Sequence, residues 1–140
     1  AAEAARLAAG AARAVAGLHA ARGGAVLHLD LRPDQFYVRP GPGGGVVVAD
    51  LNRGSQLTPG KSSLGGVCRR AGATTGRWRS PEEHAGRQLG APSDVYSLGL
   101  IVWAVYAGRR PHRGAAPEEL AAAARAGALI HDAAPEGAPE

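Results

Sequence analysis

Residues 28–38 read HLDLRPDQFYV, and residues 46–50 read VVVAD. Asp30 comes shortly after the apolar run at 25–27, and Asp50 comes shortly after the apolar run at 46–48. The two runs on either side of Asp30, residues 25–27 and 36–38, are bounded by Gly or Pro and are rich in β-branched or aromatic residues, which is the pattern of strands. A carboxylate in a loop between two strands, followed by a second carboxylate after the next strand, is how a phosphate-transferring site places a base and a metal ligand.

Four motifs, in a fixed order, resemble those of the eukaryotic protein kinase superfamily. HLDLRPDQ at 28–35 resembles the catalytic loop H-R-D-L-K-P-x-N, and DLN at 50–52 resembles the metal-binding D-F-G. SPE at 80–82 resembles the A-P-E that closes the activation segment, and SDVYSLG at 93–99 resembles the opening of the helix that follows it. A lone H-x-D also occurs in small-molecule phosphotransferases, whereas the last two motifs favour a protein kinase.

The resemblance implies a fold class and one domain. The expected fold is α+β and mostly α, a protein-kinase-like large C-terminal lobe that is incomplete at both ends. Residues 1–140 then form one partial domain, which runs from the helix before the catalytic loop to the helix after a buried one. The small N-terminal lobe, with its Gly-rich loop and strand lysine, would have to be supplied in cis.

Three segments are expected to be helical. Residues 1–21 are alanine-rich and have high helix propensity, with a poorly ordered tract as the alternative. Residues 92–107 are apolar on every side, with Ser93 as a suitable N-cap and Gly108 as a suitable C′ residue. This helix must be buried, and it is shorter than the roughly 20 apolar residues of a membrane span. Residues 117–127 resemble the next helix of the lobe, and we expect apolar surface to remain exposed.

Composition excludes several other classes of protein. The single cysteine, Cys68, excludes an internal disulfide, and it has no His or Cys at zinc-ligand spacing. The net charge of +4 rests on arginines scattered along the sequence, with Lys61 as the only lysine, so nucleic acid is not an expected partner. No secretory or membrane-spanning pattern is present, so no membrane partner is expected. Such a composition agrees with an intracellular globular protein and favours the cytoplasm.

The resemblance assigns chemistry to the catalytic loop. Asp30 matches the base that accepts the proton of the substrate hydroxyl, although without the surrounding motifs a turn-capping Asp would be the preferred interpretation. Arg32 stands where many protein-Ser/Thr kinases place a lysine near the transferring phosphate, and its planar fork replaces a compact ammonium. Gln35 replaces an asparagine whose side-chain carbonyl ligates a metal, and Tyr37 would supply the floor of the adenine pocket.

The second motif completes the nucleotide site. Asp50 matches the other metal ligand, so the resemblance implies ATP and Mg²⁺, with Gln35 and Asp50 holding the ion. Leu51 replaces a phenylalanine and would fill an apolar slot near His28. Asn52 replaces a glycine, and a position that needs φ > 0 accepts Asn more readily than other non-glycine residues.

The activation segment supplies further candidates. Thr75 aligns with the threonine that contacts the base in protein-Ser/Thr kinases, and an ordinary loop threonine is an equal alternative. Pro81 and Glu82 close the segment. In the family this glutamate pairs with an arginine from a later helix, and here Glu82 should be free or have a different partner. Arg77 and Arg79 would favour acidic residues near the acceptor.

Two residues are expected to act as structural anchors. Asp94 should hold the catalytic-loop backbone by hydrogen bonds, an arrangement that also suits a helix N-terminus, and His28 should support the same loop. Leu29 replaces the arginine that pairs with a phosphorylated activation loop in many kinases, so switching through that contact is not expected.

Two functions follow from the resemblance. The first is ATP-dependent phosphoryl transfer to protein hydroxyl groups, of the Ser/Thr type, with a protein as substrate and no activity in the isolated chain. The second is a pseudokinase that keeps the fold as a scaffold or binding module. The retained Asp30, Arg32 and Asp50 favour the enzyme. The departures at Leu29, Gln35 and Asn52 favour the pseudokinase.

Overall fold

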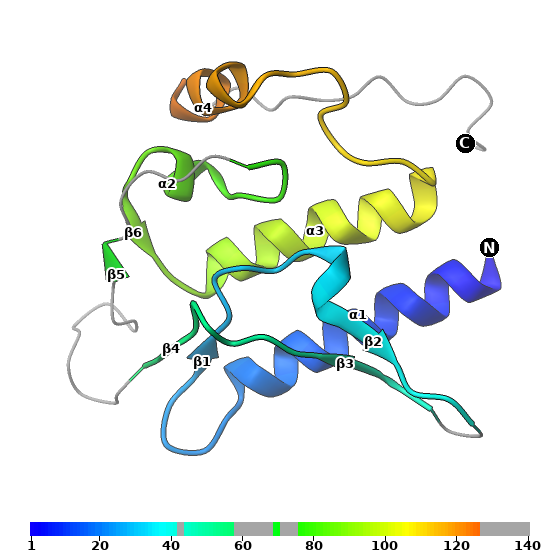
Figure 1. Ribbon diagram of the computed structural model, residues 1–140. Helices are drawn as coiled ribbons and strands as arrows, with labels where there is room; N and C mark the ends of the chain where they lie inside the picture. Colours follow the sequence, from blue (N-terminus) through cyan, green and yellow to red (C-terminus); the bar gives the residue numbers. More distant parts are fainter. Residues whose placement is uncertain (42–43, 58–68, 71–75, 127–140) are drawn as a thin grey trace.

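The computed structural model describes residues 1–41, 44–57, 69–70 and 76–126 (Figure 1). Helices dominate these ranges, and the strands form short pairs, which confirms the expected α+β, mostly α class. In chain order the elements are α1 (Ala2–His19), β1 (Val26–Leu27), the 3₁₀ turn η1 (Pro33–Gln35), β2 (Phe36–Val38), β3 (Val46–Val48), β4 (Ser55–Gln56), β5 (Arg69–Arg70), α2 (Pro81–His84), β6 (Gln88–Leu89), α3 (Ala91–Ala107) and α4 (Pro117–Arg125). Within the described ranges, no helix combines the length and apolarity that a membrane crossing requires.

Helix α1 contacts both α3 and strand β3, while α4 packs against α2 on the far side of α3 (Figure 1). The buried face of α1 consists of Gly10, Ala11 and Val15. A Cβ at Gly10 would lie 2.5 Å from Cγ2 of Val46, so only glycine lets β3 approach the helix this closely. The helix expected within residues 1–21 is therefore present as Ala2–His19, and its small residues set the packing distance.

Three antiparallel strand pairs hold the loops between the helices. Strand β1 pairs with β4, β5 pairs with β6, and β2 pairs with β3 in a register that sets Phe36 opposite Val48. The ladder continues one step further, since the Ala49 amide donates to the Gln35 carbonyl at 2.9 Å. This register brings Gln35, just before β2, and Asp50, just after β3, to the same end of the hairpin.

Helix α3 starts one residue earlier than predicted, and Ser93 is not its N-cap. Gly90 is the N-cap, and Ser93 lies in the first turn, where its Oγ accepts a hydrogen bond from the Gly90 amide at 3.3 Å. The helix ends at Gly108 with φ 64°, the left-handed C-terminal residue that the sequence predicted. Its apolar surface is only partly covered, because Val95 is 57% and Tyr106 59% exposed.

The buried apolar residues form two clusters on either side of the loop that carries Asp30. Leu31 packs with Val15 and Ile101 in one cluster, and Leu29 packs with Leu27 in the other. Because the residues before and after Asp30 are anchored in different clusters, this stretch of backbone is fixed on both sides. Asp30 is therefore presented from a rigid support.

Candidate active site

The Asp94 carboxylate, buried in the first turn of α3, holds the backbone of the candidate catalytic loop. Its Oδ2 accepts the His28 amide at 2.8 Å, and its Oδ1 accepts the Leu29 amide at 2.8 Å. Nε2 of His19, at the end of α1, lies 2.9 Å from the same carboxylate. Leu29 has φ 59°, a left-handed conformation that costs a non-glycine residue about 1–2 kcal/mol. Charge-assisted hydrogen bonds from two consecutive amides to one carboxylate keep the loop in this conformation.

His28 links this loop to the segment that carries Asp50. Its ring is fully buried, and its Nε2 lies 2.9 Å from the Ala49 carbonyl oxygen, at the end of β3. Asp50, the next residue, adopts φ 64°. The two candidate carboxylates, Asp30 and Asp50, are thus carried by segments that are tied together through one histidine.

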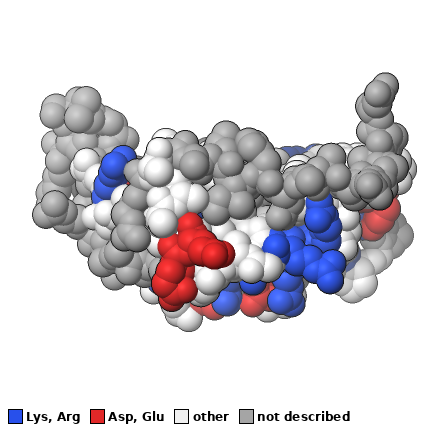
Figure 2. Space-filling view, turned by 90° about the horizontal axis from the view of Figure 1, so that it is seen from above, with Lys and Arg blue, Asp and Glu red and all other residues white. Residues whose placement is uncertain are grey.

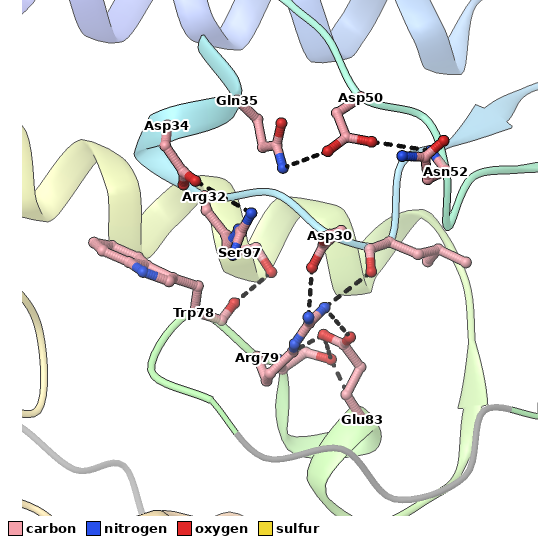
Figure 3. Close-up of polar contacts among 12 residues, drawn as sticks. Asp30, Arg32, Asp34, Gln35, Asp50, Asn52, Trp78, Arg79, Glu83 and Ser97 are labelled. Atoms are coloured by element: carbon pink, nitrogen blue, oxygen red, sulfur yellow. Dashed lines mark hydrogen bonds and ion pairs between the residues drawn. The ribbon is translucent and has the colours of Figure 1, made fainter.

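Gln35 and Asp50 meet at the end of the β2–β3 hairpin (Figure 3). Nε2 of the buried Gln35 donates to Oδ2 of Asp50 at 3.2 Å. The contact brings a side-chain carbonyl oxygen and a carboxylate together, and both are hard oxygen ligands of the kind that Mg²⁺ takes. Mg²⁺ is usually held by one or two carboxylates, water and substrate phosphates, so this small donor set fits the expected ion. Among the described residues, no group of three or more His, Cys, Asp or Glu forms a site made of protein ligands alone.

Two expectations for the segment after Asp50 are wrong. The positive φ occurs at Asp50 and not at Asn52, because Asn52 lies inside a turn closed by a hydrogen bond from the Gly54 amide to the Leu51 carbonyl at 2.8 Å. The Asn52 amide also lies 3.4 Å from Oδ1 of Asp50. Leu51 does not fill an apolar slot near His28, since its side chain is 46% exposed.

Asp30 is engaged by an arginine from the activation segment (Figure 3). Nη2 of Arg79 forms an ion pair with Oδ1 of Asp30, while its Nη1 donates to the Leu29 carbonyl at 3.0 Å and to Oε1 of Glu83 at 3.1 Å. Glu83 is itself fixed, because its other oxygen accepts the Ser80 amide at 3.0 Å in the capping box of α2. The expected base therefore belongs to a three-member charged network, Asp30–Arg79–Glu83.

Sequence reasoning missed most of this network. The sequence predicts a substrate contact for Arg79 and no role for Glu83. The S-x-x-E spacing of 80–83 is a capping-box pattern and could have indicated the role of Glu83 at the start of α2. No local pattern indicates the pairing of Arg79 with Asp30, which lie 49 residues apart.

The remaining predicted residues lie around these pairs. Arg32 forms an ion pair with Asp34 at 3.1 Å, and both side chains are partly exposed. Tyr37 is exposed on β2. Pro81 occupies the first turn of α2, and Glu82 accepts a hydrogen bond from Oγ of Ser93 at 2.6 Å. Thr75, Cys68 and Lys61 lie outside the described residues.

Burial affects the titration of one tyrosine beside this region. Burial raises the pKa of Tyr96, and the nearby Glu82 carboxylate raises it further. Both effects disfavour the phenolate, the first because charge is poorly solvated in the interior and the second because like charges repel. Tyr96 is therefore neutral wherever the fold is intact at ordinary pH.

The comparisons with known proteins agree with the motifs. The family model for the protein kinase domain matches residues 1–135. The chain is 32% identical over 93 residues to the serine/threonine-protein kinase pkn3 of Myxococcus xanthus, which covers 65% of this chain and 17% of that protein. It is 46% identical over 44 residues to the dual specificity protein kinase pyk3 of Dictyostelium discoideum, which covers 31% of this chain and 3% of that protein. The chain thus spans less than a fifth of the length of these relatives.

Proposed function

Because the chain belongs to the protein kinase family, we propose that it forms the large-lobe part of a domain that transfers the γ-phosphoryl group of ATP to the hydroxyl groups of Ser and Thr in proteins. The family match confirms the resemblance drawn from the four motifs. The observation that carries the proposal is the meeting of Gln35 and Asp50 at 3.2 Å, at one end of the hairpin that follows the Asp30 loop. A small lobe in cis and a protein substrate are parts of the same proposal.

Each residue has a part in the proposed reaction. Asp30 accepts the proton of the acceptor hydroxyl, and Arg32 stabilises charge on the transferring phosphate. Gln35 and Asp50 would hold Mg²⁺, which would supply positive charge to neutralise the phosphates of ATP. Tyr37 offers its exposed side chain as the floor for adenine. The exposed ion pair of Arg32 with Asp34 contributes little stability, so Arg32 can exchange Asp34 for a phosphate at low cost.

The ion pair with Arg79 is compatible with a base at Asp30. An ionised carboxylate has about four acceptor sites, and Arg79 contacts Oδ1. A second candidate function, a pseudokinase without transfer, is favoured by the same contact, because the guanidinium already pairs with one oxygen of the candidate base. The two candidates differ in whether the protein transfers phosphate at all.

Single-turnover phosphorylation by the full-length protein, with labelled ATP and a protein substrate, tests the proposal. Asp30→Asn should slow transfer by about 10²–10⁴-fold and leave nucleotide binding nearly intact. Asp50→Asn should weaken Mg²⁺-dependent nucleotide binding as well as transfer, and Gln35→Asn should preserve or raise activity if Gln35 is a metal ligand. Glu118→Gln, on the exposed face of α4, is the control and should change neither quantity.

The outcomes separate the two candidates. Unchanged transfer by the Asp30→Asn variant would rule out the base assignment. Complete absence of transfer in the unsubstituted full-length protein would favour the pseudokinase. The isolated chain of 140 residues should show no transfer above a no-enzyme control, because the rest of the adenine pocket belongs to the small lobe in this proposal.

A further inference from the structure

A hollow of about 760 Å³ lies beside the candidate catalytic loop and does not include the Gln35–Asp50 pair. Three segments form its walls: the loop at 32–34, the activation-segment residues 76–79, and the end of α3 with the residues after it. Its volume falls within the roughly 300–1,000 Å³ of ligand pockets. The charged residues that line it are Arg32, Arg77, Arg79, Arg109, Arg110 and Asp34.

Positive charge dominates this hollow, which we call the arginine groove. Five arginines line it with a single carboxylate, so arginines that are scattered in the sequence gather at one place in the fold. Arg32 is paired with Asp34, and Arg79 is paired with Asp30. On the face seen in Figure 2, one group of basic side chains lies apart from the largest group of acidic side chains, and further basic and acidic side chains lie elsewhere on the same face.

Two of the five arginines carry charge that no described carboxylate balances. Arg77 donates to the backbone carbonyl of His112, which is a neutral acceptor. Arg110 is exposed and forms no ion pair within the described part of the chain. A guanidinium presents five N–H donors, so Arg77 retains donors for a ligand while it holds the His112 carbonyl.

The walls of the arginine groove are fixed by the core. Trp78, between Arg77 and Arg79, packs against the cluster of Val15, Leu31 and Ile101. Its backbone carbonyl accepts a hydrogen bond from Oγ of Ser97 at 2.6 Å. Because Trp78 is held on both its side chain and its backbone, the neighbouring arginines are presented from a preorganised segment, which lowers the entropic cost of binding.

We propose that the arginine groove binds an anionic side chain, phosphoserine or glutamate, that lies a few residues from the acceptor hydroxyl in a protein substrate. This inference rests on the proposed function, since it assigns the substrate class of the same site. Guanidinium groups match phosphate and carboxylate oxygens with two parallel hydrogen bonds, and several arginines around one hollow bind a doubly charged phosphate best. Arg79 contacts Asp30 directly, so the groove lies within a few residues' reach of the acceptor.

A peptide fits these observations better than a nucleic acid. The arginines surround a concave hollow of ligand size next to the candidate base, whereas nucleic-acid surfaces spread Lys and Arg over a patch or stripe. The stacking platform that single-stranded binders use also needs exposed aromatic rings. Trp78, the aromatic residue that lines the groove, is instead packed against the core.

The test measures peptide binding by this chain with fluorescence anisotropy, without ATP. The probes are labelled nine-residue peptides with a central serine and one phosphoserine, moved through the four positions on either side. Matched peptides carry glutamate or unmodified serine at the same position. Phosphoserine should bind most tightly at one or two positions, glutamate less tightly, and unmodified serine at least about tenfold more weakly, which corresponds to about 1.4 kcal/mol.

Substitutions localise the binding. Arg110→Ala should weaken phosphopeptide binding about tenfold, and because Arg110 is exposed the fold should be unaffected. Arg22→Ala removes the same charge from an exposed arginine outside the groove and should leave affinity unchanged. Arg77→Ala should also weaken binding, and circular dichroism checks that losing its contact with His112 has not unfolded the chain.

Three results would overturn the inference. They are equal affinity for the phosphoserine and unmodified peptides, equal loss from Arg22→Ala and Arg110→Ala, and tighter binding of a nine-nucleotide RNA than of any phosphopeptide. The inference and the proposed function can fail separately. Phosphopeptide binding without transfer by the full-length protein refutes only the proposed function, whereas transfer without preference for an anionic neighbour refutes only the inference.

Discussion

Replacement of Asp94 by alanine should destabilise the fold, because one carboxylate holds two consecutive backbone amides of the candidate catalytic loop. The substitution leaves the amides of His28 and Leu29 without their acceptor, and both residues are buried. Each orphaned buried donor costs about 1–3 kcal/mol, so the expected loss is about 2–6 kcal/mol. A domain has only about 5–15 kcal/mol of stability, so Asp94→Ala should bring the chain close to unfolding. Asp94→Asn keeps one acceptor oxygen and should lose less.

Urea unfolding followed by circular dichroism measures this loss. With a slope of about 2 kcal/mol/M, a loss of about 3 kcal/mol lowers the midpoint by about 1.5 M. Glu3→Ala is the matched control, because Glu3 is also an acid in the first turn of a helix but is exposed and pairs only with Arg6. Its midpoint should stay nearly unchanged. Equal midpoints for Asp94→Ala and Glu3→Ala would refute the anchoring role.

Two further predictions concern packing and pH. Gly10→Ala should lower the free energy of unfolding by about 1–3 kcal/mol, because the new Cβ would lie 2.5 Å from Cγ2 of Val46 in β3. Gly17→Ala, on the same helix, should raise it by about 0.5–1 kcal/mol, because nothing outside the helix lies within 4 Å of the new Cβ. Thermal melting in the opposite order would contradict the packing of α1 on β3. Since the pKa of Tyr96 is raised above its ordinary value of 10.0, the unfolded chain loses this proton first and stability should fall as the pH rises above about 10. Tyr96→Phe should flatten that fall, and an unchanged pH dependence of the melting temperature would count against the burial of Tyr96.

Local patterns were sufficient to predict the longer elements. Apolar runs bounded by Gly or Pro predicted the strands at 25–27 and 36–38, and Gly108 marked the end of α3 correctly. The partner of the first strand, Ser55–Gln56, was not predicted, because a two-residue strand has no pattern of its own and this one forms by pairing with Val26–Leu27. The N-cap of α3 was misplaced because Ser93 can serve as a cap or, as observed, bond to the Gly90 amide from inside the helix.

The motifs predicted which residues form the candidate site, but they did not predict the backbone conformation of the site. Their spacing brought Gln35 and Asp50 to the same site, where the structure shows them in contact. The positive φ was expected at Asn52 because the family has glycine there, yet the turn that follows Asp50 moves it to Asp50 itself. The contacts of His19 with Asp94 and of Arg79 with Asp30 join residues 75 and 49 positions apart, and such pairings depend on the tertiary fold.

Arg79 joins the proposed base to the proposed substrate groove. An anion in the arginine groove takes two parallel donors, and Arg79 already shares its donors among Asp30, Glu83 and the Leu29 carbonyl. Glu83 is 2% exposed and Asp30 is 16% exposed, so an unpaired Glu83 costs more than an unpaired Asp30. If the arginine groove binds phosphoserine as proposed, the anion should draw Arg79 from Asp30 before it draws Arg79 from Glu83. If the proposed function holds, Asp30 becomes available to the acceptor hydroxyl only when an acidic substrate has drawn Arg79 away. The Arg79–Asp30 ion pair would then select for acidic substrates.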